Sequence, residues 1–370
     1  MSERVLITGG CGFVGSHLAD AYLERGYSVR VLDNLNPTVH ESSNKAPTYL
    51  SKDVEFIRGD IRDTETLVAS LKNVSIVSHH AAAVSVVQSM SKPSRFAEVN
   101  TLGTARLLEL LTDRDRFPIR KLIVPSSMSI YGEGLYQAGG NEVTPHLRSK
   151  EQLESKSWEI LSNGEVCKPV PTPETKPLRP TSIYAITKRD QEEMALAIGE
   201  ASRIPTVALR YFNIYGPRQS LSNPYTGVAA IFSSRLLNGN PPVVFEDGGQ
   251  LRDFVHVSDI VQANILATIN DSIDQGVYNI GSGNPVSILE VAERLIELFE
   301  FPGEPSITQT ARSGDIRHCY ADISKATEEL GYRPKAIFDD SLKELIEWVS
   351  TQTATDNFDA AYKKLNLTSH

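Results

Sequence analysis

Short runs of branched apolar residues alternate with longer stretches of helical periodicity through the first half of the chain. Buried strands of a parallel sheet appear as short apolar runs, whereas the covering helices carry an apolar stripe at a period of 3.6 residues. The pattern predicts an α/β fold with a doubly wound parallel sheet. Strands are expected over residues 4–8, 28–33, 54–58, 74–78, 122–125 and 206–210, and helices over 12–25, 64–71, 93–111 and 182–201.

The segment 132–180 interrupts this alternation. It is rich in Pro, Gly, Glu and Lys and lacks sustained periodicity, so it is expected to form a long surface insertion. Residues after about Thr351 are polar and are expected to form a loosely held tail. Between these two segments, helices are expected over 228–237, 257–269 and 288–299, and strands over 243–245 and 277–280.

Two domains are predicted. Residues 1–212 plus 255–282 form the larger one, which contains the insertion, and residues 213–254 plus 283–350 form a smaller α/β substrate-binding domain, followed by a 351–370 tail. In doubly wound sheets the ligand lies in the crevice at the carboxyl ends of the strands.

Composition narrows the class of protein. The chain of 370 residues is 40% hydrophobic and 22% charged, as in soluble globular proteins. Its formal net charge of −9 argues against nucleic acid or an anionic membrane as the main partner. Three scattered cysteines suit neither a disulfide framework nor a metal site, so we expect a cytoplasmic protein without a metal.

A glycine-rich turn follows the first strand and opens the first helix. Gly9 permits the tight turn, Gly12 lets a pyrophosphate approach the backbone, and Gly15 allows close helix–strand packing. The helix N-terminus adds free N–H groups and a favourable dipole. The fold is therefore predicted to be of the Rossmann type. The run is Thr8-Gly9-Gly10-Cys11-Gly12-Phe13-Val14-Gly15.

Asp33 ends the second strand, roughly 20 residues beyond the glycines, which is the spacing of a ribose-binding carboxylate. Such a carboxylate accepts hydrogen bonds from the adenosine ribose and repels a 2′-phosphate. No arginine follows in Asp33-Asn34-Leu35-Asn36. The predicted cofactor is therefore NAD rather than NADP.

Tyr184 and Lys188 lie four residues apart, on one face of a predicted helix. A lysine ammonium near a phenol, together with the nicotinamide charge, lowers the phenol pKa and suits it for acid–base work. This spacing is common by chance. Here it follows both the glycine turn and the run from Ser126 to Gly132 at the end of a buried strand, and that combination is specific.

At this point the chain resembles the extended short-chain dehydrogenase/reductase family, in particular its nucleotide-sugar epimerases and dehydratases. The resemblance covers roughly residues 3–350. Its motifs occur in order: TGGCGFVG, Gly59-Asp60-Ile61, His79-His80-Ala81-Ala82, Asn100-Thr101-Leu102-Gly103-Thr104, SSMSIYG, Tyr184/Lys188, Arg210-Tyr211-Phe212-Asn213, Arg252-Asp253-Phe254-Val255-His256-Val257 and Arg312-Ser313-Gly314-Asp315.

The resemblance implies a cofactor site in which Asp60 and Ile61 hold the adenine, while Ala81, Ala82 and Asn100 line the channel. The full set of implied cofactor-binding residues is Gly9, Gly12, Phe13, Val14, Gly15, Asp33, Asn34, Asp60, Ile61, Ala81, Ala82, Asn100, Tyr184, Lys188 and Tyr211.

The resemblance also implies a catalytic set. Ser127 would hydrogen-bond the reacting sugar oxygen, Tyr184 would be the acid–base group, and Lys188 would hold the nicotinamide ribose and tune Tyr184. Arginine matches pyrophosphate geometry, and an aromatic ring such as Phe245 can pack on a base. The implied substrate-binding residues are Ser127, Ser129, Asn213, Val228, Phe245, Arg252, Arg312 and Asp315.

Positions 128 and 129 favour C4 epimerisation through a transient 4-keto sugar. Met128-Ser129 replaces the Asp-Glu pair of the 4,6-dehydratases, and the decarboxylases carry Glu where Ser129 stands. The long insertion, Val87-Gln88-Ser89-Met90, residues 221–228 and residues 314–319 resemble the dTDP-L-rhamnose 4-epimerase group. Members of that group carry a cysteine pair in the insertion, whereas only Cys167 lies there in this chain, and no metal is expected.

Alternatives remain open from the sequence. UDP-glucuronate or UDP-hexose 4-epimerisation is the runner-up, followed by a nucleotide-sugar dehydratase or reductase and by an NAD-binding protein without catalysis. The last is disfavoured because Ser127, Tyr184 and Lys188 are all present. The resemblance further implies a homodimer built from the helices near 93–111 and 182–201.

Overall fold

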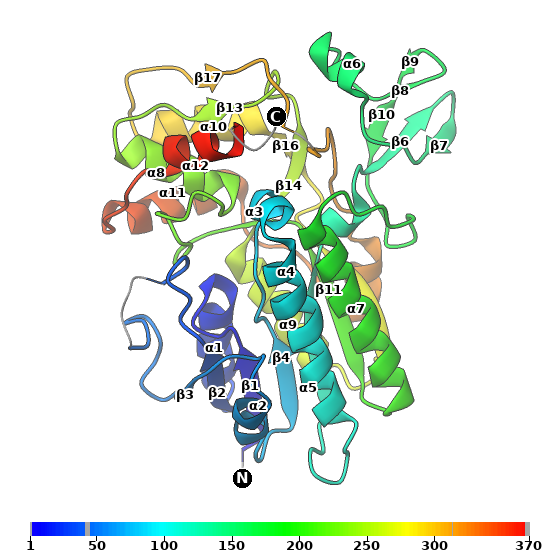
Figure 1. The fold of residues 1–370 in the computed structure, drawn as a ribbon, viewed down its shortest axis with the longest axis vertical. Helices are drawn as coiled ribbons and strands as arrows, with labels where there is room; N and C mark the ends of the chain where they lie inside the picture. The colour runs from blue at the N-terminus through cyan, green and yellow to red at the C-terminus, as the bar shows by residue number, and fades with distance from the viewer. Residues whose placement is uncertain (1, 41–44, 313, 367–370) are drawn as a thin grey trace.

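The computed structural model describes residues 2–40, 45–312 and 314–366, and its centre is a seven-stranded parallel sheet (Figure 1). Strand order reverses between β1 and β4, which creates the crevice expected of a doubly wound sheet. The prediction of a Rossmann-type α/β fold is confirmed. From edge to edge the strands are β15 (Gln275–Ile280), β11 (Thr206–Tyr211), β5 (Lys121–Ser127), β4 (Ile76–His79), β1 (Arg4–Thr8), β2 (Ser28–Asp33) and β3 (Glu55–Arg58).

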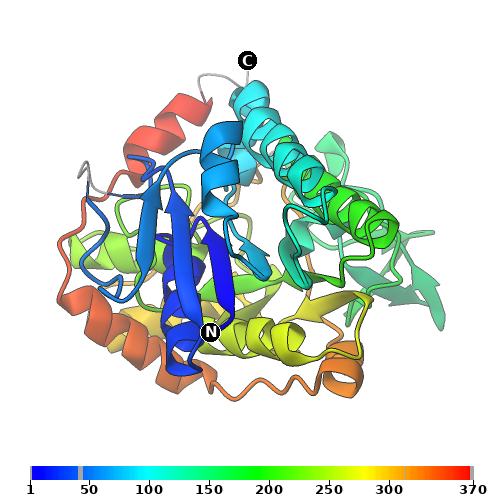
Figure 2. The ribbon, with the colours of Figure 1, turned by 90° about the horizontal axis from the view of Figure 1, so that it is seen from below.

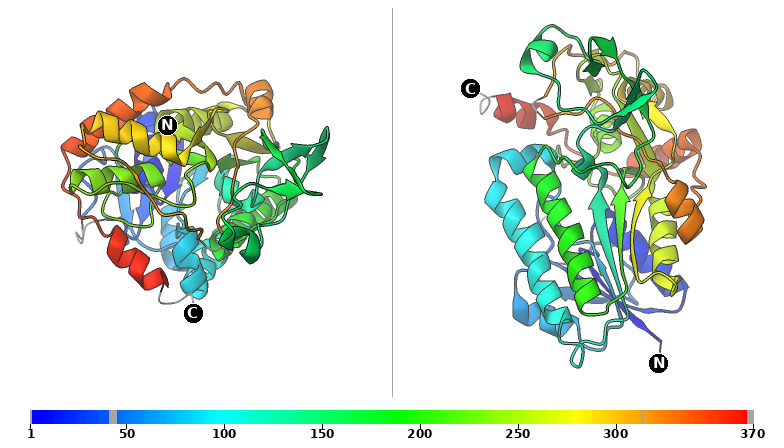
Figure 3. Two further views of the ribbon diagram at one scale, coloured as in Figure 1. Left: turned by 90° about the horizontal axis from the view of Figure 1, so that it is seen from above. Right: turned by 90° about the vertical axis from the view of Figure 1, so that its right-hand side faces the viewer.

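Helices cover both faces of this sheet because alternate strand residues point to opposite sides (Figures 2 and 3). Leu6 of β1 packs in a core with α2 (Thr64–Ser70), α5 (Gly103–Leu111) and α7 (Ile183–Ala201). Its neighbours Val5 and Ile7 pack on the other face, with α1 (Phe13–Glu24) and α9 (Val257–Ile269). Two apolar cores therefore hold the central strand, and both faces of the sheet are buried.

The predicted helix over 93–111 is continuous but not uniform. It consists of α4 (Pro93–Phe96), the π-helical stretch η1 (Ala97–Leu102) and α5. Stretches of π-helix occur often at functional sites because they redirect a side chain. Here the stretch contains Asn100, which is completely buried.

The remaining elements near the cavity include α3 (Val86–Ser91), which the periodicity did not predict. The 3₁₀ turn η2 (Met128–Tyr131) continues directly from β5.

The smaller lobe surrounds a separate apolar core, formed by α8 (Val228–Leu237), α10 (Ile288–Leu298) and α11 (Phe338–Ser350). Because β15 belongs to the large sheet while these helices share their own core, we propose the domain boundaries given above. The other elements of this half are β12 (Asn213–Tyr215), β13 (Val243–Val244), β14 (Leu251–His256), β16 (Pro285–Ser287), β17 (Ser306–Ile307) and η3 (Ala326–Leu330).

The insertion has more structure than its sequence indicated. It projects beside the smaller lobe (Figure 1) and contains a three-stranded antiparallel sheet over a small core of Tyr136, Ile160 and Cys167. Buried ion pairs fix it to the rest of the chain, so it is not a loose surface loop. Its elements are β6 (Leu135–Ala138), β7 (Asn141–Val143), α6 (Lys150–Glu154), β8 (Leu161–Ser162), β9 (Glu165–Val166) and β10 (Lys168–Val170).

The expectation of a loosely held tail is wrong for the described part, residues 351–366. This segment contains α12 (Phe358–Asn366), whose Phe358 and Tyr362 rings pack against Phe245. The polar composition concealed two aromatic rings spaced four residues apart, which share one face of a helix. The last four residues, 367–370, lie outside the described part.

In the described part of the chain, no helix combines the length and apolar character that a membrane crossing requires.

Candidate active site

A cavity of about 830 Å³ opens at the carboxyl ends of the central strands. It extends from the glycine turn past the ends of β4 and β5 to α8 and α12. Every residue predicted from the sequence to bind cofactor or substrate lines this cavity except Asn100. Residues as far apart in the sequence as Gly9 and Asp315 thus line one cavity, as the topology of the sheet requires.

The glycine turn forms a cradle that admits no side chains at two positions. Gly9 has a φ of +67°, and a Cβ on Gly15 would lie 2.5 Å from the Gly9 carbonyl oxygen. Gly12 is the N-cap of α1 and has no side-chain cap, so the first N–H groups of the helix are left for another acceptor. Backbone N–H groups at a helix N-terminus suit a phosphate, and the predicted dinucleotide fits here.

Asp33 anchors the turn from the next strand. One carboxylate oxygen accepts the Cys11 N–H at 3.0 Å and the other accepts the Leu35 N–H at 2.9 Å. A carboxylate offers about four lone-pair sites, so acceptor capacity remains for ribose hydroxyls at the cavity wall.

Asp60 lies beside this wall and receives a 2.9 Å hydrogen bond from the Asn34 amide. Hydrogen bonds from Arg62 lower the pKa of Asp60 to about 2, so its carboxylate is charged at neutral pH.

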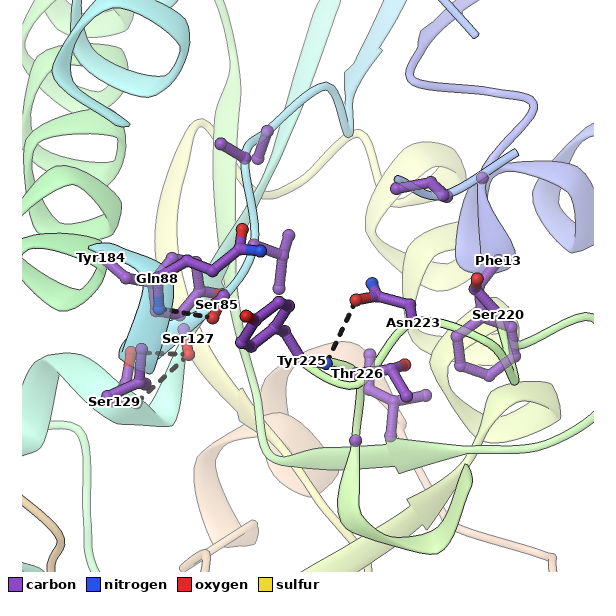
Figure 4. A pocket seen from close by; sticks show the side chains of 18 of the residues that line it. Phe13, Ser85, Gln88, Ser127, Ser129, Tyr184, Ser220, Asn223, Tyr225 and Thr226 are labelled. Atoms are coloured by element: carbon purple, nitrogen blue, oxygen red, sulfur yellow. Dashed lines mark hydrogen bonds between the residues drawn. The ribbon is translucent and has the colours of Figure 1, made fainter. Parts of the chain in front are cut away.

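Tyr184 and Ser127 meet where α7 begins and β5 ends (Figure 4). Ser182 caps α7 by accepting the Ala185 N–H at 3.1 Å, which fixes Tyr184 in the first turn. Both the N–H and the hydroxyl of Ser129 donate to Ser127 Oγ, at 3.2 and 2.9 Å. Burial raises the pKa of Tyr184, and a hydrogen bond with Ser127 opposes that rise. The serine pair therefore orients an acceptor and a donor beside the phenol.

The expectation that the Lys188 ammonium and the nicotinamide charge together lower the phenol pKa of Tyr184 stays a prediction. The amine donates to the Pro125 carbonyl and, at 2.7 Å, to Gln191 Oε1. Burial lowers the pKa of Lys188 itself to about 7, and Glu192 opposes this shift. Its fixed hydrogen bonds point the amine at the backbone of β5, and the net pKa shift of Tyr184 is upward.

Asn100 was expected to line the cofactor channel, and that expectation is wrong. Its amide donates to the Ala83 carbonyl at 3.0 Å and its carbonyl accepts the Ala83 N–H at 2.7 Å. The amide also donates to Thr187 of α7 at 3.0 Å. Asn100 therefore joins the loop after β4 to α7 from behind the cavity wall.

Two arginines expected at the pyrophosphate have different surroundings. Arg252 donates to the carbonyls of Leu251, Ile316 and Arg317, which holds its guanidinium at the cavity wall and commits part of its donors. Arg312 forms a 2.8 Å ion pair with Asp315 and lies 4.5 Å over the Phe245 ring. Arg312 therefore keeps most of its donors available to an anion.

Some cavity residues were not assigned from the sequence. Ser85, Gln88 and Tyr225 stand around Ser127 and Tyr184 in Figure 4, and Phe358 and Tyr362 line the opposite end. Gln88 and Tyr225 lie in runs that resemble the rhamnose epimerase group, which was the only signal available. Nothing in their local sequence indicates which side chains face the ligand.

Histidines near the site serve structural roles. His79 bonds to the hydroxyls of Thr8 and Thr104, whereas His80 bonds to Ser78 and stacks on Tyr211. Across residues 2–40, 45–312 and 314–366, no three His, Cys, Asp or Glu side chains converge in a way that could bind a metal ion.

Known proteins share both the sequence pattern and the fold. The pattern of the NAD dependent epimerase/dehydratase family matches residues 5–281. The chain is 33% identical to dTDP-L-rhamnose 4-epimerase of Burkholderia thailandensis, over 96% of this chain and 97% of that protein.

Solved structures agree. UDP-glucose 4-epimerase of Thermotoga maritima with UDP-glucose aligns with a TM-score of 0.75, at 32% identity, over 94% of this chain and 98% of that one. The Thermus thermophilus UDP-glucose 4-epimerase complex with NAD aligns with a TM-score of 0.75, at 31% identity, over 95% of this chain and 100% of that one.

Proposed function

The chain belongs to the NAD dependent epimerase/dehydratase family, and on that premise we propose that it inverts C4 of dTDP-L-rhamnose. It is an NAD-dependent nucleotide-sugar 4-epimerase. The observation that carries the proposal is the meeting of Ser127, Tyr184 and Lys188 in one cavity with the glycine cradle.

The cofactor fits the residues present, because the glycine cradle leaves room and free N–H groups where a pyrophosphate would lie. Asp33 would hold the adenosine ribose, while Asp60 and Ile61 would flank the adenine. NAD held by these residues would supply reversible hydride transfer at C4 of the sugar.

The catalytic side chains handle the proton. As the phenolate, Tyr184 takes the proton of the sugar hydroxyl, and as the phenol it returns a proton to the carbonyl oxygen at the end of the cycle. Ser127 hydrogen-bonds the same oxygen and is itself oriented by Ser129. The Lys188 amine, one helical turn after Tyr184, is fixed by its hydrogen bonds to the Pro125 carbonyl and the Gln191 side chain.

The Met128 thioether has no proton to exchange, and the Ser129 hydroxyl donates to Ser127, so these two positions do not supply the acid–base pair that a dehydration needs.

The sugar itself is inferred from similarity and charge. The relative from Burkholderia thailandensis acts on a 6-deoxy sugar, which carries no charge. Figure 4 labels Ser85, Gln88, Ser129 and Tyr225 near Ser127 and Tyr184, and all four have neutral hydrogen-bonding side chains. Neutral hydrogen-bonding groups suit sugar hydroxyls, whereas a carboxylate favours a cation. A UDP-hexose is the second candidate, since the structural neighbours include a UDP-glucose complex.

The test is product NMR with the purified protein and no added NAD, on dTDP-L-rhamnose, UDP-glucose and UDP-glucuronate separately. Conversion of dTDP-L-rhamnose to its C4 epimer supports the proposal. Turnover of a UDP-sugar alone would contradict the substrate assignment. Tyr184→Phe is expected to lower kcat by about 10²- to 10⁴-fold while NAD content stays unchanged.

We also propose a homodimer in the cytoplasm. Leu102 of η1 and Ile186 of α7 are 46% and 42% exposed on neighbouring helices, in the region expected to pair. Three free, buried cysteines suit a reducing compartment. Light scattering of Leu102→Glu is expected to show the monomer mass, whereas Val166→Glu, an exposed apolar position on the insertion, should keep the dimer.

A further inference from the structure

Helix α12 contributes to the cavity wall, although the family resemblance ends near residue 350 and gives this helix no role. Phe358, Ala361 and Tyr362 all line the cavity. They lie three and four residues apart and so share one face of the helix. Ala361 is 7% exposed, which shows that this face is covered.

The aromatic rings of this face meet Phe245. The Tyr362 and Phe358 ring centroids lie 5.5 and 6.5 Å from that of Phe245. Phe358 and Tyr362 are nearly parallel, with an interplanar angle of 7°. The Arg312 guanidinium lies 4.5 Å over Phe245 on the same cavity wall. Three rings and a cation therefore gather at one point of a solvent-accessible cavity.

Polar contacts hold α12 and the residues just before it against the smaller lobe. Arg235 of α8 pairs with Asp356 at 3.2 Å and with Asp359 at 3.1 Å, and its guanidinium lies 4.9 Å over the Phe358 ring. Asn357 donates to the Ser222 carbonyl at 2.9 Å. Arg235 is buried, so these contacts hold the helix in one place on α8.

We propose that Phe358 and Tyr362, which pack beside Phe245, form part of the wall of the compartment that holds the pyrimidine base of the nucleotide sugar. Flat aromatic rings bind nucleobases by stacking, and an adjacent arginine serves the phosphate side of the same ligand. The inference rests on the proposed function, because it needs a pyrimidine nucleoside diphosphate as the common part of the substrate. It assigns a binding role to a segment whose sequence predicts only a tail.

The test compares the binding of dTDP to the full-length holoprotein with that to the double variant Phe358→Ala/Tyr362→Ala, by calorimetry. Loss of base stacking is expected to raise the Kd for dTDP about 5- to 100-fold. The affinity for inorganic pyrophosphate and the NAD content should remain unchanged. Lys363→Ala, on the exposed side of the same helix, is the matched control and should bind dTDP like the wild type. The single variant Phe358→Tyr keeps a flat ring at this position and should bind dTDP with wild-type affinity.

Three outcomes separate the possibilities. Wild-type affinity for dTDP in the double variant would overturn the inference and leave the proposed function standing. Tighter binding by the double variant would also overturn it, because α12 would then obstruct the compartment rather than complete it. If the wild type binds neither dTDP nor UDP, the proposed function fails, and this inference fails with it.

Discussion

At the scale of single residues, the site depends on a buried chain of hydrogen bonds behind the cavity wall. Lys188 donates to Gln191, whose amide donates to Thr104 at 2.7 Å. Thr104 bonds His79 at 2.9 Å, and His79 bonds Thr8 at 2.8 Å. Each of these groups is almost completely buried, where an unpaired polar atom is costly. These hydrogen bonds therefore fix Lys188 relative to the first strand.

The burial of His79 and His80 predicts that the protein loses stability at acid pH. Burial, followed by the charge of Lys188, lowers the pKa of both His79 and His80 to about 3. The folded chain keeps these rings neutral down to that pH, whereas the unfolded chain protonates them near pH 6.5. Unfolding therefore takes up protons between pH 6.5 and 3, and the free energy of unfolding falls as pH is lowered.

Urea unfolding at several pH values checks this expectation. His80→Gln is expected to reduce the slope of stability against pH in that window, because one of the two buried rings is gone. His146→Gln, at an exposed position on the insertion, is the control and should leave the slope unchanged. An unaltered slope in His80→Gln would show that His80 does not contribute.

At the scale of elements, the turn between β1 and α1 combines two different constraints on glycine. A Cβ on Gly15 would meet backbone atoms of Gly9 and Gly10 at 2.5 and 2.7 Å, which cannot move without displacing the turn. A Cβ on Gly12 would meet only the Gly9 carbonyl oxygen, at 3.2 Å. The lack of space at Gly15 therefore constrains folding, whereas the open space at Gly12 leaves room for a ligand.

We therefore expect Gly15→Ala to lower stability by about 1–3 kcal/mol through overpacking. Gly12→Ala should fold with a nearly normal Tm yet carry much less NAD, since Gly12 lines the cavity. Thermal melts and the NAD released on denaturation measure the two effects. Equal losses of Tm in both variants would contradict the separation of roles.

At the scale of the whole molecule, the insertion is joined to the smaller lobe by buried charges. Glu246 pairs with Arg148 of the insertion at 2.8 Å and with Arg317 at 3.0 Å, and all three side chains are at most 2% exposed. Arg317 also pairs with Glu159 of the insertion. These contacts place the insertion beside the wall of the cavity formed by residues 314–316.

Glu246→Gln is expected to destabilise the protein by about 3–5 kcal/mol, because it leaves two buried guanidinium groups without their shared carboxylate. Glu193→Gln, in an exposed pair with Arg189, should cost less than about 1 kcal/mol. Chemical denaturation of both variants measures the difference. A small effect of Glu246→Gln would show that water compensates the buried charges.

The sequence by itself determined the sheet, the glycine turn and the candidate residues Ser127, Tyr184 and Lys188, which line one cavity. Apolar runs and helical periodicity are local properties, and the motifs around Asp33, Ser127 and Tyr184 identify ligand chemistry wherever the chain takes them.

Only the tertiary structure decided the rest. It turned Asn100 away from the cavity, directed Lys188 to Pro125 and Gln191, and joined Arg148 to Glu246 across 98 positions. It also brought the ring of Phe358 onto Phe245 from a segment whose composition indicated a tail. The physical reason is that a buried side chain takes its partners from whatever packs against it, and those partners are distant in sequence.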